Sequence, residues 1–317
     1  MGGVLDMERK KLLLLHPSEY EHPFDRKALQ TLEGNQKLEK IIKKIYKHSI
    51  ERINRISHSG SFLKITSNNL PDIYELLEEA CANLQFKEIP DLYVKRDGSI
   101  NAYTAGVKNP LILLHSASVD RLTPDELLYI IGHELGHIKS GHMLYHDMSQ
   151  YIKFAGEIAG EATLGVGSLI SRGLEYPLLH WARMSEFTCD RAGLLTCQDL
   201  DVAMDVQMKL AGVPNKFYDK MDNKEFIKQA REFKGYDYDG LDKVAKTYLI
   251  MEQTHPWSVM RASELLKWHE TGKYDEIVDK HGKGSIEELE ISCTKCGRML
   301  KGTETFCGVC GTKVGNR

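Results

Sequence analysis

The sequence has no long apolar run. Crossing a bilayer takes about 20 consecutive apolar residues, and the nearest approach, residues 154–170, contains Glu157 and Glu161. Inserting two carboxylates into lipid would be costly. Residues 1–15 hold five charged side chains and an apolar run of only four residues, which does not match a secretory signal peptide. We therefore expect no spanning segment and no secretion signal.

A strong excess of charge and a disulfide framework are also missing. The net charge is −3 over 317 residues, which gives no whole-chain reason to expect nucleic acid or an anionic membrane as a partner. Four of the seven cysteines lie in the last 25 residues as two CxxC pairs, and three are scattered. That distribution favours a metal site in a reducing compartment over secreted disulfides, so we expect a cytoplasmic protein.

The apolar pattern predicts a mostly α-helical protein with a small antiparallel β-sheet, an α+β fold. Three short apolar runs between residues 91 and 115 are separated by turn residues and predict the sheet. Helical spacing of apolar residues predicts helices near 25–56, 71–84, 123–140, 148–171, 178–197, 200–211, 222–234, 239–253 and 257–270. We divide the chain into an N-terminal helical region (1–70), a catalytic domain (71–280), a linker (281–291) and a cysteine module (292–317).

The segment HELGH at residues 133–137 carries a metal-binding pattern. Residues four apart share one face of a helix, so His133 and His137 can converge on one ion. Glu134 can then take a proton from water at an open metal position. Thr123 begins this helix as the N-cap and Glu126 completes a capping box. The sequence therefore predicts a zinc site on an N-capped amphipathic helix, with Glu134 as the general base.

A catalytic zinc site needs a third protein ligand. His142 lies nine residues after His133, one short of the spacing used by proteases with a third histidine, and Gly141 would end the helix before it. Glu186 is the better candidate, because Glu186 and Asp190 share one face of a later helix. One carboxylate could bind zinc while Asp190 orients the ring of His133. The spacing also fits an alternative in which Glu186 and Asp190 are surface charges paired with nearby arginines and have no role at a metal site.

Five short segments occur in an order that resembles the HtpX and CAAX prenyl endopeptidase family of zinc metalloproteases. The resemblance covers about residues 70–265, and Cys189 stands where the family usually has alanine. We interpret the chain as a soluble member of this family. The segments are 101–106 (NAYTAG), 123–127 (TPDEL), 133–137 (HELGH), 185–187 (SEF) with Asp190, and 254–256 (THP) with Arg261.

The resemblance implies a gluzincin fold, with His133, His137 and Glu186 as zinc ligands and Glu134 as the catalytic base. It also implies that the strand near Leu111 to Leu114 lines the cleft and that an extended peptide adds to its edge. Within the family context, His255 would stabilise the oxyanion or latch the open zinc position, and Arg191 and Arg261 would assist electrostatically. The substrate-contacting residues implied are Asn101, Ala102, Leu111, Ile112 and Leu113.

The C-terminal cysteines predict a closed structural zinc site. Ten residues separate the two CxxC pairs, and a glycine that permits a tight turn follows each pair. Because a module of this size has almost no hydrophobic core, the metal must supply its folding energy. The four ligands are Cys293, Cys296, Cys307 and Cys310.

The leading hypothesis is therefore a zinc endopeptidase with one catalytic and one structural zinc ion, acting on protein or peptide substrates. Two alternatives stay open. In one, the cysteine module, a zinc ribbon, recruits the protease to DNA or to a protein partner. The simpler interpretation of its positive charge is a solvated surface, so nucleic acid is not the expected partner. In the other, the fold is a catalytically inert or latched peptide-binding protein.

Overall fold

The capping box before HELGH begins the helix that carries the site, α7 (Pro124–Lys139). Thr123 Oγ1 accepts a hydrogen bond from the Glu126 amide at 3.3 Å, and Glu126 Oε2 accepts one from the Thr123 amide at 2.8 Å. The helix ends at Lys139 with Ser140 as its C-cap, just before Gly141, which has a φ of 72°. Both predicted ends are confirmed.

The computed structural model describes residues 9–33, 51–147, 166–235, 256–284, 290–293, 295–301 and 303–313.

Helix α9 (Val166–Cys197) crosses α7 at very close range. A Cβ atom added to Gly136 would lie 2.7 Å from the Cβ of Ala192, and one added to Gly132 would lie 2.3 Å from Thr196 Oγ1. Carbon atoms in contact normally lie about 3.5–4.0 Å apart. The absence of side chains at these glycines is therefore what lets the backbones of α7 and α9 approach each other.

Four strands form one mixed sheet in the order β1–β2–β4–β3. Strands β2 (Asp91–Lys95) and β4 (Leu111–His115) are parallel, whereas β1 (Leu63–Ile65) pairs antiparallel with β2 and β3 (Ala102–Ala105) pairs antiparallel with β4. The predicted fold class is confirmed, but one strand pair is parallel and β1 was not predicted.

The strand order also corrects one expectation. Strand β4 lies between β2 and β3, and all five of its residues are buried. Its backbone is paired on both sides, so Leu111, Ile112 and Leu113 do not form an open edge for a peptide. Continuous apolar runs are typical of inner strands, which have no solvent-facing side. The edge strand on this side of the sheet is β3.

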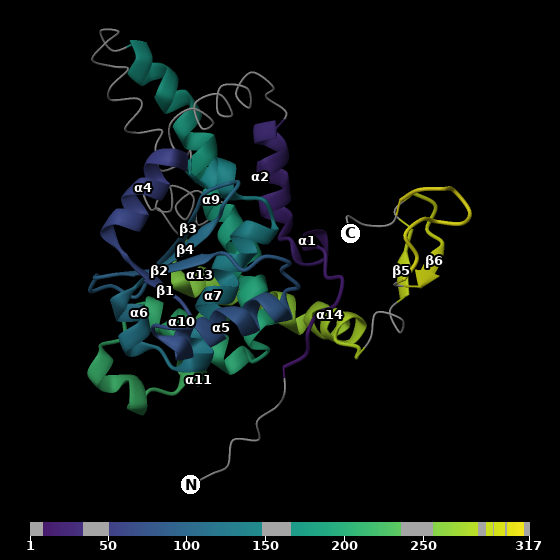
Figure 1. Cartoon of the computed structure of the whole chain (residues 1–317). Helices are drawn as coiled ribbons and strands as arrows, with labels where there is room; N and C mark the ends of the chain where they lie inside the picture. Colours follow the sequence, from purple (N-terminus) through teal and green to yellow (C-terminus); the bar gives the residue numbers. More distant parts are fainter. Residues whose placement is uncertain are drawn as a thin grey trace.

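The remaining helices surround the α7–α9 pair and the sheet (Figure 1). Helix α4 continues through Ser61, five residues beyond the end of the helix expected near 25–56. Two expected helices fall wholly or largely outside the described residues, at 239–253 and 148–171. The others are α5 (Pro71–Asn83), α4 (Glu51–Ser61), α6 (Ser116–Arg121), α10 (Leu200–Leu210), η2 (Asn215–Lys220), α11 (Asn223–Gly235), α13 (Ser258–Glu270) and α14 (Lys273–His281).

Residues 9–33 lie against this body and contain α1 (Pro17–Tyr20) and α2 (Pro23–Glu33). Leu12, Leu15 and Tyr20 belong to the same hydrophobic core as the apolar residues of α7 and α9. The Leu13 amide donates to the carbonyl of His281 at 2.9 Å, and His281 Nδ1 lies 2.7 Å from the Leu13 carbonyl oxygen. The beginning and end of residues 9–284 are therefore bonded to each other.

Strands β5 (Glu290–Ser292) and β6 (Met299–Lys301) form a separate antiparallel hairpin near the C-terminus, drawn in yellow beyond α14 in Figure 1. Within the described part of the chain, no helix is long and apolar enough to cross a membrane.

Candidate metal centre

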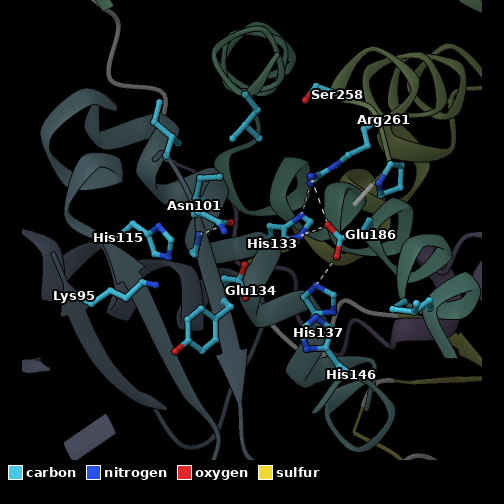
Figure 2. A pocket seen from close by; sticks show the side chains of 18 residues that line it. Lys95, Asn101, His115, His133, Glu134, His137, His146, Glu186, Ser258 and Arg261 are labelled. Atoms are coloured by element: carbon cyan, nitrogen blue, oxygen red, sulfur yellow. Dashed lines mark hydrogen bonds and ion pairs between the residues drawn. The ribbon is translucent and has the colours of Figure 1, made fainter. Parts of the chain in front are cut away.

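The side chains of His133 and His137 meet Glu186 where α7 crosses α9 (Figure 2). The Nε2 atom of His133 lies 3.4 Å from one carboxylate oxygen of Glu186, and Nε2 of His137 lies 3.4 Å from the other. Ligand atoms about 2.0–2.1 Å from a tetrahedral zinc ion lie about 3.4 Å from each other. All three side chains are buried. The donor types and these two nitrogen–oxygen distances fit a zinc ion.

Asp190 lies behind the ring of His133, one helical turn after Glu186 on α9. Its Oδ1 atom is 3.2 Å from His133 Nδ1. A carboxylate only accepts hydrogen bonds, so this contact places a ring proton on Nδ1, and Nε2 is the nitrogen that faces Glu186. The sequence-based expectation for Asp190 matches this geometry.

Asp190 is itself held by three further donors. Arg261 from α13 donates from Nε to Oδ2 at 2.9 Å and from a terminal nitrogen to Oδ1 at 2.5 Å. The Tyr129 hydroxyl donates to Oδ1 at 2.9 Å, and the amide of Gln207 donates to the same oxygen at 3.1 Å. Burial alone would raise the pKa of Asp190, but the Arg261 guanidinium lowers it to about 2. The carboxylate is therefore fixed in position and charged.

The two imidazoles sit in different electrostatic environments. Burial disfavours the charged form of both rings. At His133 the carboxylates of Asp190 and Glu186 overcome burial and raise the pKa to about 9. At His137 burial outweighs the single carboxylate of Glu186 and lowers the pKa to about 4. In the metal-free protein, the His137 ring is thus neutral at pH 7 and available as a metal ligand.

Glu134 points into a cavity of about 630 Å³ between the sheet and the helices (Figure 2). Thr104 of β3 donates from Oγ1 to Glu134 Oε2 at 2.5 Å. This bond ties the edge strand to α7 and orients the carboxylate. Asn101 and Ala102 line the same cavity with both imidazoles and Glu186, so the edge strand runs beside the three donors.

The structure places the other expected site residues as follows. Arg261 lies at the centre, 3.5 Å from Glu186 Oε2. Arg191 lies away from the metal centre. It donates to the backbone carbonyls of Tyr20 and Glu21, and its guanidinium carbon lies 5.0 Å from the centre of the Trp268 ring. Adjacent helical residues point about 100° apart, so Arg191 cannot share the face of Asp190, and that expectation is wrong. His255 lies outside the described residues.

Three further donors surround His137. His142 Nδ1 is 3.3 Å from His137 Nδ1, and Cys189 Sγ is 3.7 Å from that same His142 atom. His142 therefore lies behind the ring, on the Nδ1 side. Cys189 Sγ lies within 4.8 Å of ring nitrogens of both His133 and His137, so these three residues form a possible ligand group. Burial raises the pKa of Cys189 well above its ordinary value, which favours the neutral thiol. His146 lies on the cavity side and forms a possible ligand group with His137 and Glu186.

Sequence reasoning missed Thr104, Gln207 and His146. A threonine in an edge strand and a glutamine in a helix carry no spacing signal. His146 does carry a weak one, because it follows His142 by four residues on the next helical turn.

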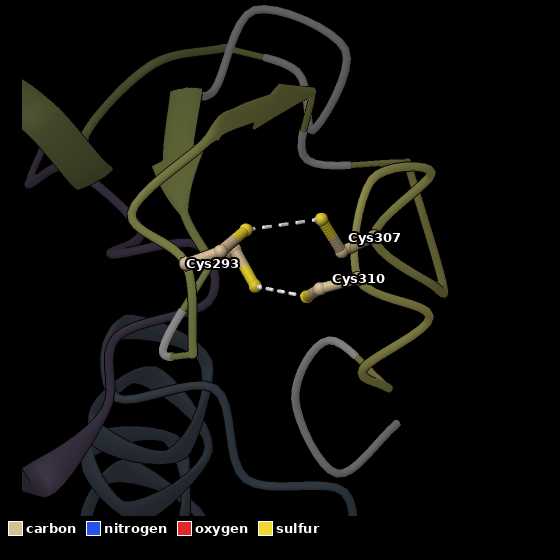
Figure 3. Close-up of side chains that lie close together, drawn as sticks. Cys293, Cys307 and Cys310 are labelled. Carbon is tan, nitrogen blue, oxygen red and sulfur yellow. Dashed lines mark hydrogen bonds between the residues drawn. The ribbon is translucent and has the colours of Figure 1, made fainter.

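The four C-terminal cysteines form a second cluster (Figure 3). The Sγ atoms of Cys293 and Cys310 lie 3.5 Å apart, and those of Cys296 and Cys307 lie 3.6 Å apart. Thiolates bound about 2.3 Å from a tetrahedral zinc ion lie about 3.8 Å apart. The glycines after the two pairs, Gly297 and Gly311, have φ of 73° and 69° and donate back to the carbonyls of Cys293 and Cys307. The thiol geometry fits a closed metal site.

A helix carrying HExxH, a facing acidic helix and an adjacent edge strand define a metal-dependent peptidase. The model of Peptidase family M48 matches residues 67–269, and the chain belongs to this family. No solved structure matches it.

Three relatives show how far the similarity extends. The plastoglobule-localized metallopeptidase 48 of Arabidopsis thaliana is 31% identical over 273 residues, which cover 86% of this chain and 78% of that protein. A protease HtpX homolog of Helicobacter pylori is 45% identical over 69 residues, 21% of each chain. Metalloprotease YcaL of Escherichia coli is 34% identical over 73 residues, 23% of this chain and 28% of that protein. The similarity supports a metalloprotease.

Proposed function

We propose that this chain is a zinc-dependent endopeptidase whose catalytic metal is held by His133, His137 and Glu186. The observation that carries the proposal is the position of the Glu186 carboxylate, 3.4 Å from both Nε2 atoms. A zinc ion bound there would supply Lewis acidity, acidifying water and polarising a peptide carbonyl.

Glu134 acts as the general base in this proposal. It lies one residue after His133 on α7 and faces the cavity, so its carboxylate can take a proton from water next to the three donors. The Thr104 hydroxyl occupies one carboxylate oxygen and restricts the side chain to this orientation. The same carboxylate would then deliver the proton to the departing amine nitrogen. Arg261 keeps Asp190 charged, which holds His133 in place.

The substrate would be an extended peptide segment lying along β3. This strand is the last in the sheet order, and Asn101 and Ala102 line the cavity beside Glu134. Backbone hydrogen bonds to an edge strand bind peptides of many sequences. We therefore expect cleavage of exposed segments of protein substrates with weak sequence preference.

We further propose that the cysteine cluster binds a structural zinc ion in a ribbon at 292–317, joined by a linker to the peptidase unit. Residues 9–33 share the core of that unit, which supports counting the N-terminal region as part of it. Four of the seven cysteines form a metal-type cluster and not disulfides, which supports a reducing compartment such as the cytoplasm. The Arabidopsis relative is named as chloroplastic, so imaging of a tagged chain is the check.

Cleavage of casein by the wild-type chain and by Glu134→Gln, with zinc measured per chain, tests the proposal. We expect two zinc ions in both proteins and activity only in the wild type. Glu186→Ala should lose one zinc ion, whereas His146→Ala should keep both. Loss of zinc from His146→Ala but not from Glu186→Ala would reassign the third ligand.

Inactivity of both the wild type and Glu134→Gln at full zinc occupancy would favour the inert or latched alternative. His255→Ala then separates these two cases, because activity that appears only in this variant would identify a latch.

A further inference from the structure

Asp25, in α2, is almost fully buried behind the candidate metal centre although it lies outside the residues that match the family model. It is 2% exposed and accepts three hydrogen bonds. Trp181 Nε1 donates to Oδ1 at 3.0 Å, Thr188 Oγ1 donates to Oδ2 at 2.6 Å, and His142 Nε2 lies 3.1 Å from Oδ2. A buried carboxylate with three donors has a fixed orientation.

His142 connects this carboxylate to His137. Because a carboxylate only accepts hydrogen bonds, its contact with His142 Nε2 requires the proton on that nitrogen. In the neutral ring, Nδ1 of His142 is then an acceptor, and it lies 3.3 Å from Nδ1 of His137. Cys189 Sγ also approaches this acceptor, at 3.7 Å. A His137 ring that donates to it carries its proton on Nδ1 and directs its Nε2 lone pair towards Glu186.

We propose that Asp25 is a positioning residue for the metal centre, acting through His142 to fix the tautomer and orientation of His137. The inference rests on the proposed role of His137 as a zinc ligand. His133 has the equivalent support from Asp190 by direct contact. The two imidazoles are thus each oriented by a buried carboxylate, one supplied by α9 and the other by the N-terminal segment.

The N-terminal segment is anchored so that Asp25 stays in place. The His22 amide donates to Thr188 Oγ1 at 3.0 Å, and the same hydroxyl donates to Asp25. Arg191 donates to the carbonyls of Tyr20 and Glu21 at 3.1 Å each. This gives Arg191 a role that differs from the electrostatic assistance predicted from the sequence: it fastens the segment that carries Asp25 to α9.

The first experiment measures zinc affinity of the non-thiolate site by competition with a chelator, in the full chain, with the ribbon zinc as internal reference. Loss of such a supporting partner typically lowers metal affinity 10–100-fold, and we expect this for Asp25→Asn and for His142→Phe. His142→Gln should recover most of the affinity, because its amide can donate to Asp25 and accept from His137.

A double-mutant cycle separates positioning from a general packing effect. If Asp25 acts through His142, Asp25→Asn should lower affinity in the wild type but have no further effect in His142→Phe. Additive losses would overturn the proposal. Glu264→Gln is the matched control, since it removes the carboxylate charge 3.1 Å from His22 without touching the connection to His137. It should keep wild-type affinity, and a loss equal to that of Asp25→Asn would overturn the proposal.

The second experiment records imidazole ¹⁵N chemical shifts of the metal-free protein, with the His137 signal assigned from His137→Gln. His137 should be protonated on Nδ1 in the wild type and should become a mixture of tautomers in Asp25→Asn. An unchanged tautomer in a folded Asp25→Asn variant would overturn the inference. Failure of the proposed function looks different, because Glu186→Ala would then retain its zinc whatever the tautomer of His137.

Discussion

Replacing Gly136 with alanine should push α7 and α9 apart and weaken the metal site without touching any proposed ligand. The new methyl group would lie 2.7 Å from the Cβ of Ala192 and 3.1 Å from the Cα of Cys189. Normal carbon contacts are about 3.5–4.0 Å, so the helices must separate locally by roughly 1 Å. Neither neighbour is the flexible end of a long side chain, so the backbone has to move.

The size of the effect follows from two opposing contributions. Overpacking of a tight contact costs about 1–3 kcal/mol, while exchanging glycine for alanine inside a helix gains about 1 kcal/mol. Gly60 in α4 provides the matched control, because a Cβ atom added there would meet nothing within 4 Å. Gly60→Ala should stabilise the chain, and Gly136→Ala should be less stable than this control by roughly 1–3 kcal/mol, the overpacking cost itself.

Denaturant unfolding of both variants measures the stability difference, and chelator competition measures the zinc affinity. Metal–ligand distances tolerate only about 0.2 Å of change, so a shift of α9 that carries Glu186 away from the imidazoles should lower affinity at least tenfold. Equal stabilisation of Gly136→Ala and Gly60→Ala, with unchanged zinc affinity, would refute the idea that the glycine contact positions Glu186.

Three other outcomes are expected. Asp190→Asn should lower zinc affinity about 10–100-fold and, in a ¹⁵N pH titration of the metal-free protein, lower the pKa of His133, because the Asp190 carboxylate helps to raise it. Burial would raise the pKa of Glu19, but hydrogen bonds from two basic residues of α14, including His281, lower it to about 2. Its stabilising contribution is therefore full above its ordinary pKa of 4.5 and is lost as pH falls towards 2, so acid unfolding of Glu19→Gln should show a weaker pH dependence over this range. Chelation of the thiolate-bound metal should unfold residues 290–313 and make them sensitive to protease while the peptidase unit stays folded, because the hairpin has almost no core.

Local signals in the sequence predicted the helix that carries the site and both of its ends. A capping box and a terminal glycine act within a few residues, so they can be identified without knowing the rest of the fold. The i, i+4 spacing also showed that Glu186 and Asp190 share one helix face. It left paired surface charges open, and the family resemblance was what favoured Glu186 as a ligand.

Contacts between distant segments could not be predicted in this way. The position of β4 inside the sheet depends on which strands pair, and an apolar run fits either an inner or an outer place. Arg191 was assigned to the centre from its place in the sequence, yet its direction around the helix takes it to the N-terminal segment. No sequence pattern marked Asp25 as a site residue, because a single aspartate in a helix does not reveal which buried histidine it contacts.

The bonds between Leu13 and His281 have a practical consequence for anyone who expresses part of this chain. A fragment trimmed to residues 67–269 would leave bare the apolar surface that Leu12, Leu15 and Tyr20 cover, and we expect it to aggregate. Since the two ends of the peptidase unit already touch, a short linker could join them and new termini could be opened at an exposed loop, such as the one around Gly98.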